Sequence, residues 1–331
     1  MTRFSAITAT GLYVPPREVH NDVLRARLVP STPGFINKLD SRPGIMRRWH
    51  AEPDKVTSDL VVAAAAQALE QAGLQPTDLD LIVVGTDSPD TMTPATSVFV
   101  QHKLGATGAG TFDIGCACAS FPTGLATAAG IMATNSGINN VLVAGAYMMQ
   151  KLADHNDPSI FFYGDGAGAV ILQSSQRPGY LGSTFYSDGS LARNWGIYSG
   201  GTLEPATHES IDAGRTNVRV VDRYPPEVNR EQWPKIVRRL AAENHFDLGE
   251  VAHFIFTQVN RSTIEEAMED LGQPMERAHM IMDRYGYTGS ACIPMALHDA
   301  AAQGLIKSGD LVVMVGSGVG FNLAATAVRW Q

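Results

Sequence analysis

Cysteine is scarce in this chain, and the spacing of its three cysteines matches neither a disulfide scaffold nor a metal-binding motif. Among 331 residues the cysteines are Cys116, Cys118 and Cys292, so the first two are separated by a single residue. Three cysteines spaced in this way do not make a disulfide scaffold, and no CxxC pair or His/Cys cluster indicates a metal site. We therefore expect no bound metal and a reducing, cytoplasmic location.

Positive charge is also in short supply. Lys and Arg number 25 against 33 Asp and Glu, which gives a net charge of −8. A chain with this balance has no general attraction for nucleic acid or for an anionic membrane surface. Residues 1–10 lack the long apolar core of a signal peptide, and no apolar run approaches the length of a membrane span. We expect neither a nucleic-acid partner nor a membrane association.

The chain does contain enough apolar residues for a well-buried globular protein, since 44% are hydrophobic and 18% are charged. Its length suits two domains or one large duplicated domain. The runs LDLIVV (79–84) and NVLVAGA (140–146) are continuously apolar, which is typical of strands buried on both faces. Helical segments alternate with these strands, so the pattern predicts an α/β fold.

The stretch from Thr111 to Met132, TFDIGCACASFPTGLATAAGIM, carries the strongest chemical signal. It predicts a strand, a turn of small residues and an Ala-rich helix with Pro122 in its first turn, where proline is tolerated. Cys118 then lies where the strand meets the helix, and helix-start N–H groups and the helix dipole favour a thiolate nucleophile there. The alternative is a buried structural cysteine, an interpretation that suits Cys116.

The order of elements is repeated. In the first half a helix, LDLIVVGT, a second helix and the Cys118 segment follow one another, and in the second half a helix, HFIFTQ, a helix and a segment around Tyr287 do the same. The Tyr287 segment is itself predicted to begin as a strand at residues 280–282. An internal repeat of this kind decides the fold, so we expect two similar halves, residues 1–174 with the cysteine and residues 175–331, packed as one body.

Two parts of the chain are less informative. Residues 47–50, Arg-Arg-Trp-His, are best interpreted as a solvated turn. Residues 176–226 are rich in Gly, Ser and Tyr and show only weak strands.

Taken together, several motifs resemble the thiolase-like condensing enzymes, and most closely β-ketoacyl-acyl-carrier-protein synthase III. The resemblance covers nearly the whole chain and is carried by TGLYVP, RPGIMRR, FDIGCACASF, GDGAGAV, TQVN, YGYTGSACIPMAL and GSGVGF. It implies a duplicated α/β/α/β/α sandwich, usually a homodimer. It also implies that an acyl thioester of coenzyme A or of an acyl carrier protein delivers its acyl group to the active cysteine, with no permanently bound cofactor.

Residue by residue, the resemblance places the family's cysteine on Cys118. The oxyanion-hole N–H groups fall on Cys118 and Val319, where only the backbone acts. The family's histidine lies in a His-Gln-Ala-Asn run that reads Thr257-Gln258-Val259-Asn260 here, so Thr257 replaces it. The asparagine falls on Tyr287. Both replacements carry O–H donors, but neither is a good base near neutral pH.

Asp87 is a candidate base for the second half of the reaction. Gly85-Thr86-Asp87 resembles the Gly-Thr-Glu of hydroxymethylglutaryl-coenzyme A synthase, whose glutamate is a general base in the same superfamily. A carboxylate serves in this way if its pKa is raised. The alternative is a turn or cap residue at the end of a strand.

The expected substrate-binding residues are Phe35, Asn260, Arg47 and Arg261. Phe35 falls at the family's tryptophan that stacks on the adenine of coenzyme A, whereas the facing arginine is replaced by Asp157. The two arginines suit an acidic carrier protein or the pantetheine phosphate, and the loss of the nucleotide-facing cation favours a carrier-bound donor.

The sequence therefore predicts an acyltransferase of fatty-acid or polyketide-type metabolism in which Cys118 carries the acyl group. Two alternatives remain, a catalytically idle partner subunit of a condensing heterodimer and an acyl-thioester hydrolase. Retention of Cys118 in a helix-start turn argues against the idle subunit. Neither the acyl chain length nor the acceptor follows from the sequence.

Overall fold

The computed structural model describes residues 3–28 and 44–331. Within them the strands form two large sheets and two small ones. The first large sheet has the order β1-β7-β6-β4-β5, with β4 parallel to both of its neighbours and β7 antiparallel to β1 and β6. Its strands are β1 (Phe4–Tyr13), β4 (Leu81–Gly85), β5 (Gly110–Ile114), β6 (Asn140–Tyr147) and β7 (Gly166–Ser175).

The second large sheet has the order β11-β12-β13-β8. Its strands are β8 (Tyr180–Ser187), β11 (Val251–Phe256), β12 (Leu311–Gly318) and β13 (Asn322–Arg329). The small sheets pair β2 (Arg17–His20) with β3 (Arg47–His50), and β9 (Trp195–Gly196) with β10 (Arg219–Val220).

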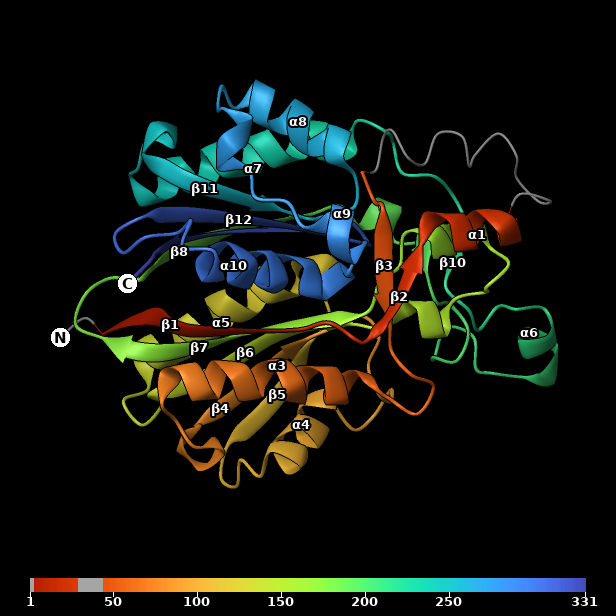
Figure 1. Cartoon of the computed structure of the whole chain (residues 1–331), viewed down its shortest axis with the longest axis horizontal. Coiled ribbons are helices and arrows are strands. Elements are labelled where there is room, and N and C mark those ends of the chain that lie inside the picture. Colours follow the sequence, from red (N-terminus) through yellow and green to blue (C-terminus); the bar gives the residue numbers. More distant parts are fainter. Residues whose placement is uncertain (1–2, 29–43) are drawn as a thin grey trace.

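Helices lie on both faces of each large sheet, so the molecule has five layers (Figure 1). The outer layers are α3 (Thr57–Ala72) and α4 (Thr96–Leu104) on one side, and α7 (Val228–Asn244) and α8 (Arg261–Asp270) on the other. Between the sheets lie α5 (Ser120–Thr134) and α10 (Cys292–Ala302). The short helices are α1 (Asn21–Leu28), α6 (His208–Asp212) and α9 (Met282–Tyr285). The expected α/β/α/β/α sandwich is confirmed.

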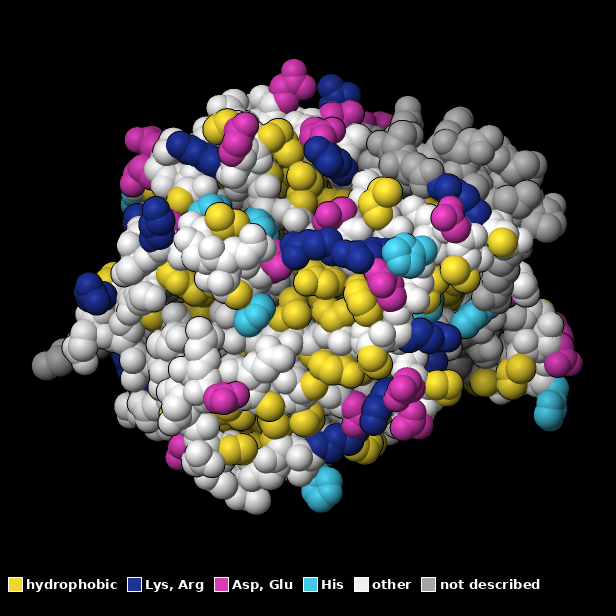
Figure 2. Space-filling view, in the orientation of Figure 1, with side chains coloured by type: hydrophobic (Ala, Val, Ile, Leu, Met, Phe, Trp, Pro, Cys, Tyr) yellow, Lys and Arg dark blue, Asp and Glu magenta, His cyan; other side chains and the backbone are white. Residues whose placement is uncertain are grey.

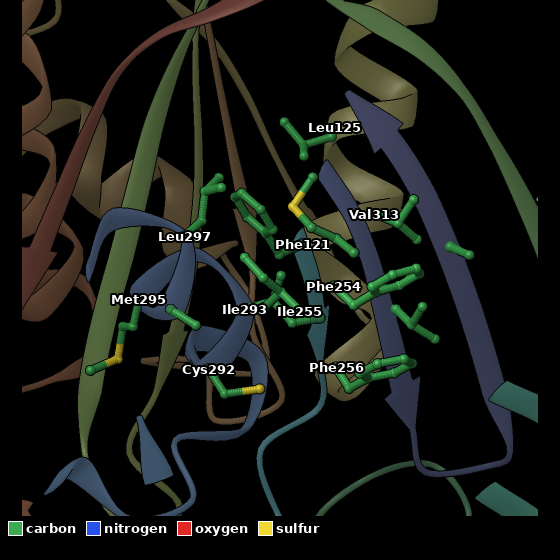
Figure 3. Packing of buried hydrophobic residues seen from close by; sticks show 14 of the residues in the cluster. Phe121, Leu125, Phe254, Ile255, Phe256, Cys292, Ile293, Met295, Leu297 and Val313 are labelled. Atoms are coloured by element: carbon green, nitrogen blue, oxygen red, sulfur yellow. The ribbon is translucent and has the colours of Figure 1, made fainter. Parts of the chain in front are cut away.

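The central helices are apolar on most sides because both of their faces are covered. Figure 3 shows Phe121 and Leu125 of α5, Ile293 and Leu297 of α10 and residues of β11 in one packed core. All of these side chains are buried. Alternation along β11 divides its side chains between the two faces of the sheet. Phe256 stacks on Trp233 of α7 with ring centroids 5.1 Å apart.

Glycines on the strands let the central helices approach closely. A Cβ on Gly316 of β12 would lie 2.7 Å from both Ala119 Cα and Cys118 O, at the start of α5. A Cβ on Gly145 of β6 would lie 2.2 Å from Ser290 O, just before α10. Each central helix therefore begins against the backbone of a strand, which fixes the position of the residues that precede it.

Two local predictions are wrong. Residues 47–50 are strand β3, not a solvated turn, and the Arg48 side chain is fully buried, donating to Phe161 O and Asn21 Oδ1. The guanidinium also lies over the Phe161 ring, so contacts with protein atoms take the place of contacts with water around the Arg48 side chain. No strand forms at residues 280–282, where α9 begins instead; the neighbouring Ala278 makes only an isolated bridge to Phe254.

The surface of the described residues is mixed in charge. Figure 2 shows Lys and Arg interspersed with Asp and Glu over the face in view. Within these residues no helix is both long and apolar enough to cross a membrane.

The glycine contacts predict that an alanine at the crowded Gly316 destabilises the fold, whereas an alanine at the uncrowded Gly130 does not. Gly316→Ala forces the start of α5 away from β12, and overpacking of this kind costs about 1–3 kcal/mol of unfolding free energy. Gly130→Ala is the matched control, because Gly130 is an exposed residue of α5 with no atom near its Cβ direction. That substitution should stabilise the helix by about 0.5–1 kcal/mol. Urea unfolding measures both values, and a Gly316→Ala protein as stable as wild type would contradict this packing argument.

Candidate active site

Cys118 lies in the turn that joins β5 to α5. The chain leaves β5 at Ile114, passes through a 3-10 turn at Ala117–Ala119 and enters α5 at Ser120. Ala117 has φ = 48°, a left-handed conformation that is uncommon for a residue with a side chain and is often found at functional sites. Cys118 follows it and is 2% exposed. The strand–turn–helix context predicted from the sequence is present.

Tyr287 contacts Cys118 from the second half of the chain. It lies between α9 and α10, and its hydroxyl forms a hydrogen bond with the Cys118 Sγ. Burial raises the pKa of Tyr287 well above its ordinary value, so the phenol keeps its proton and is the stronger of the two donors in this bond. The Tyr287 ring packs against Tyr147 of β6 with centroids 5.7 Å apart, which fixes the direction of the hydroxyl.

The surroundings of the Cys118 thiol favour its protonated form. Burial raises its pKa well above the usual value, and the nearby charge of Asp87 adds to the shift. The hydrogen bond from Tyr287 opposes this, but it is the smaller effect. Burial of the sulfur thus opposes the thiolate that the helix start favours, and the thiolate stays a prediction.

Thr257 follows β11 and is 2% exposed. Its Oγ1 accepts a hydrogen bond from the Ser317 backbone N–H at 2.8 Å. This bond fixes the hydroxyl against the end of β12 while leaving the hydroxyl proton free for a donor role. Thr257 is therefore placed as a neutral donor.

Asp87 lies beyond the C-terminal end of β4, where sites in α/β sheets commonly collect. One carboxylate oxygen accepts a hydrogen bond from Ser290 Oγ at 2.9 Å, and the same Ser290 hydroxyl is 3.0 Å from Ala117 O. Burial raises the pKa of Asp87 to about 6 even though the Ser290 bond lowers it. A carboxylate with this pKa is suited to accept a proton near neutral pH.

A cavity of about 430 Å³ brings these groups together. Of the predicted residues, those that line it are Asp87, Thr257, Tyr287, Val319 and Asn260. Cys118 does not itself line the cavity, but its hydrogen-bond partner Tyr287 does. The turn that holds Val319 lies against the cysteine turn, because a Cβ on Gly318 would be 2.1 Å from Cys116 O.

Of the predicted substrate-binding residues that the structure describes, Asn260 lines this cavity, whereas Arg47 and Arg261 lie apart from it. Asn260 caps α8 by accepting from Ser262 N–H at 3.2 Å, in addition to lining the cavity. Arg47 forms an ion pair with Glu18 at 2.7 Å, and Arg261 forms one with Glu265 at 2.8 Å; neither lines the cavity. Phe35 lies outside the described residues.

Sequence reasoning missed several residues that complete the site. The hydroxyl of Tyr224 accepts from Gly320 N–H at 3.1 Å, and Trp195 Nε1 donates to Tyr163 Oη at 3.2 Å; all three aromatic side chains line the cavity. Tyr224 and Trp195 belong to residues 176–226, where the sequence pattern is weak. Ser290 follows Tyr287 in the motif YGYTGSACIPMAL, so that motif could have indicated it.

Profiles of one protein family match both halves of the chain. Residues 112–189 match 3-oxoacyl-[acyl-carrier-protein (ACP)] synthase III, and residues 241–330 match the C-terminal part of the same enzyme. The β-ketoacyl-[acyl-carrier-protein] synthase III of Solibacter usitatus is 33% identical over 329 residues, covering 98% of each chain. The acetoacetyl CoA synthase NphT7 of Streptomyces sp. (strain CL190) is 31% identical, again with 98% of each chain covered.

Solved structures agree with these matches. The 3-oxoacyl-[acyl-carrier-protein] synthase III of Aquifex aeolicus superposes with a TM-score of 0.86 at 29% identity, covering 98% of this chain and 100% of that one. The priming β-ketosynthase of the R1128 polyketide pathway superposes with a TM-score of 0.87, also at 29% identity, covering 99% and 97%. The strand–turn–helix segment around Cys118, the thiolase-like layers and the full-length similarity lead to one conclusion: the chain belongs to the β-ketoacyl-acyl-carrier-protein synthase III family of acyl-transferring condensing enzymes.

Proposed function

We propose that this enzyme loads an acyl group from a coenzyme A or carrier-protein thioester onto Cys118 and transfers it to an acceptor whose proton is taken by Asp87. The observation that carries the proposal is the hydrogen bond between Cys118 and Tyr287 beside a cavity that also holds Asp87. Nucleophile, hydroxyl donor and carboxylate base are thereby assembled around one space.

Thr257 and Tyr287 stand, in this proposal, where other family members have histidine and asparagine. Thr257 follows a buried strand and Tyr287 precedes a buried helix, and both side chains face the cavity. As neutral hydroxyl donors they can polarise a thioester oxygen, although less strongly than a charge-assisted donor. They cannot act as bases, so proton removal falls to Asp87.

The backbone N–H groups of Cys118 and Val319 form the proposed oxyanion hole. The close contact of their two turns at Gly318 and Cys116 supports this pairing. The acyl donor is a substrate, so no permanently bound cofactor is required. Asn260 is placed to contact the pantetheine arm, while Arg47, Arg261 and Phe35 stay predicted contacts of the nucleotide or the carrier protein.

The two halves, residues 1–174 and 175–331, are proposed to derive from a duplication. The strands of the first large sheet end at Ser175, and those of the second begin at Tyr180. We further propose that the enzyme is a homodimer formed along β5, an edge strand of the first sheet whose residues are all at least partly exposed. This edge leads directly into the Cys118 turn.

Acyl loading and transfer can be separated by one experiment. Intact-protein mass spectrometry after incubation with acyl-coenzyme A and acyl-carrier thioesters should show one acyl adduct per chain, absent in Cys118→Ala. Asp87→Asn should keep the adduct, because it removes a negative charge that disfavours the thiolate, but should slow single-turnover transfer about a hundredfold. In wild type, transfer should rise as the pH increases through about 6, since Asp87 acts as a base only when deprotonated.

The pH dependence should disappear in Asp87→Asn. Failure of every donor to label wild type would refute the acyltransferase proposal and favour the idle-partner subunit. Labelling followed by release of free acid alone would favour the hydrolase.

Tyr287→Phe should make Cys118 less reactive. A hydrogen bond to a charged group contributes about 1.5–3 kcal/mol, so its loss should raise the pKa of Cys118 by about one to two units. The rate of alkylation by iodoacetamide as a function of pH measures this shift. Tyr163→Phe is the matched control, because Tyr163 lines the same cavity but bonds to Trp195. Equal alkylation profiles for Tyr287→Phe and wild type would contradict the proposed donor role.

Light scattering coupled to size-exclusion chromatography should give the mass of a dimer. Twice the chain mass of 35.4 kDa is expected at micromolar concentration. A stable monomer would rule out the proposed pairing along β5, whereas a requirement for a different subunit would favour a heterodimer.

A further inference from the structure

The cavity has an unusual charge balance. Of the described residues that line it, Asp87 alone is charged, and none is Lys, Arg or His. Most of the remaining wall is aromatic or apolar, including Phe162, Tyr163, Trp195 and Phe321. A ligand that enters therefore meets one negative charge and no cation on these walls.

The groups that surround Asp87 do not compensate its charge. The titratable groups that interact electrostatically with the Asp87 carboxylate are Cys118 in the turn before α5, Tyr147 on β6, Tyr163, Tyr287 and Cys292 at the start of α10. Burial raises the pKa of each of these, so all are neutral at physiological pH, and ionisation of any of them would add further negative charge. Ser290 supplies a hydrogen bond but no charge.

A second carboxylate in such a space is unfavourable. Two like charges in a poorly solvated site repel each other, and one of them must take up a proton or stay outside. A malonyl-type acceptor brings a carboxylate to its reacting end and, in losing carbon dioxide, has no need of a base. An uncharged acceptor avoids the repulsion and gives Asp87 a proton to accept.

We propose that the cavity selects an acceptor whose reacting end is uncharged and carries a removable proton, and that it discriminates against carboxylated, malonyl-type acceptors. This inference rests on the proposed acyl transfer through Cys118. It adds the substrate class, namely a thioester with α-hydrogens or another neutral nucleophile such as an alcohol or amine.

The transfer step balances without any further reactant. The acceptor proton moves to the Asp87 carboxylate, and the electron pair left on the acceptor forms a bond to the acyl carbon. The bond between that carbon and Cys118 Sγ breaks, and the sulfur leaves with its electron pair. The proton held by Asp87 then returns to the sulfur, which restores the Cys118 thiol. No carbon dioxide is released.

Charge selection can be measured by binding alone. Two non-reactive pantetheine thioethers are compared, identical except that one ends in a carboxylate and the other in a carboxamide of the same shape. At pH 8 the full-length wild-type enzyme should bind the carboxamide at least about tenfold more tightly, as expected for like charges sharing a site. The ratio should shrink as the pH falls through about 6, where Asp87 takes up a proton.

Asp87→Asn should abolish the preference at every pH. Asp222→Asn is the matched control, because Asp222 is exposed and lies two residues from the cavity-lining Tyr224 without lining the cavity itself. It should leave the ratio unchanged. Equal binding of both thioethers to wild type at pH 8, or a preference that survives Asp87→Asn, would overturn the inference.

The acceptor class is then identified on the acyl-enzyme. Wild type carrying an acyl group on Cys118 is mixed separately with an acetyl thioester, a primary amine, an alcohol and a malonyl thioester, and the products are weighed by mass spectrometry. Turnover with the acetyl thioester, the amine or the alcohol supports the inference, and the mass of the product identifies the kind of bond formed. Turnover with the malonyl thioester alone overturns it. A wild type that shows charge selection but never forms the acyl adduct would instead refute the proposed function.

Discussion

The structure depends on the close approach of two buried helices to the strands that face them. Both α5 and α10 lie between the large sheets, and each begins where a glycine on a neighbouring strand leaves room for backbone contact, Gly316 for α5 and Gly145 for α10. The turns that contain Cys118 and Ser290 are the segments held in this way. Their positions are set by main-chain packing between layers, which is less adjustable than contact between flexible side chains.

This packing produces a site with a protonated sulfur and a nearby carboxylate. The same burial that positions Cys118 raises the pKa of its thiol, and it also raises the pKa of Asp87 to about 6. Desolvation therefore disfavours the thiolate form of Cys118 and the carboxylate form of Asp87 alike. The hydroxyl of Tyr287 partly offsets the first effect by donating to the sulfur. The balance differs from that of a cysteine paired with an imidazole, which would draw the thiol proton toward a neutral base.

Much of the fold was predictable because periodicity and repetition report burial directly. The two-sided apolar strands, the Ala-rich helix after Cys118 and the repeated order of elements predicted two similar α/β halves packed as one body, whereas the five-layer sandwich followed from the family resemblance. The end of the buried strand β4 indicated Asp87 as a candidate site residue, whereas Thr257 was identified through the family resemblance, and both line the cavity. Long-range contacts were not predictable in the same way. The burial of Arg48 depends on Phe161 and Asn21, and the raised pKa of Cys118 depends on solvent exclusion by both halves. Trp195 and Tyr224 lie where short strands leave no periodic signal.

The bond between Cys118 and Tyr287 joins residues 169 positions apart. A ribosome makes the chain from its N-terminus, so Cys118 is synthesised before Tyr287. During that interval the cavity lacks the lining residues that the second half of the chain contributes. The sulfur of a nascent chain therefore lacks this hydrogen-bond partner. The bond and the cavity beside it form only once the polypeptide extends past Tyr287.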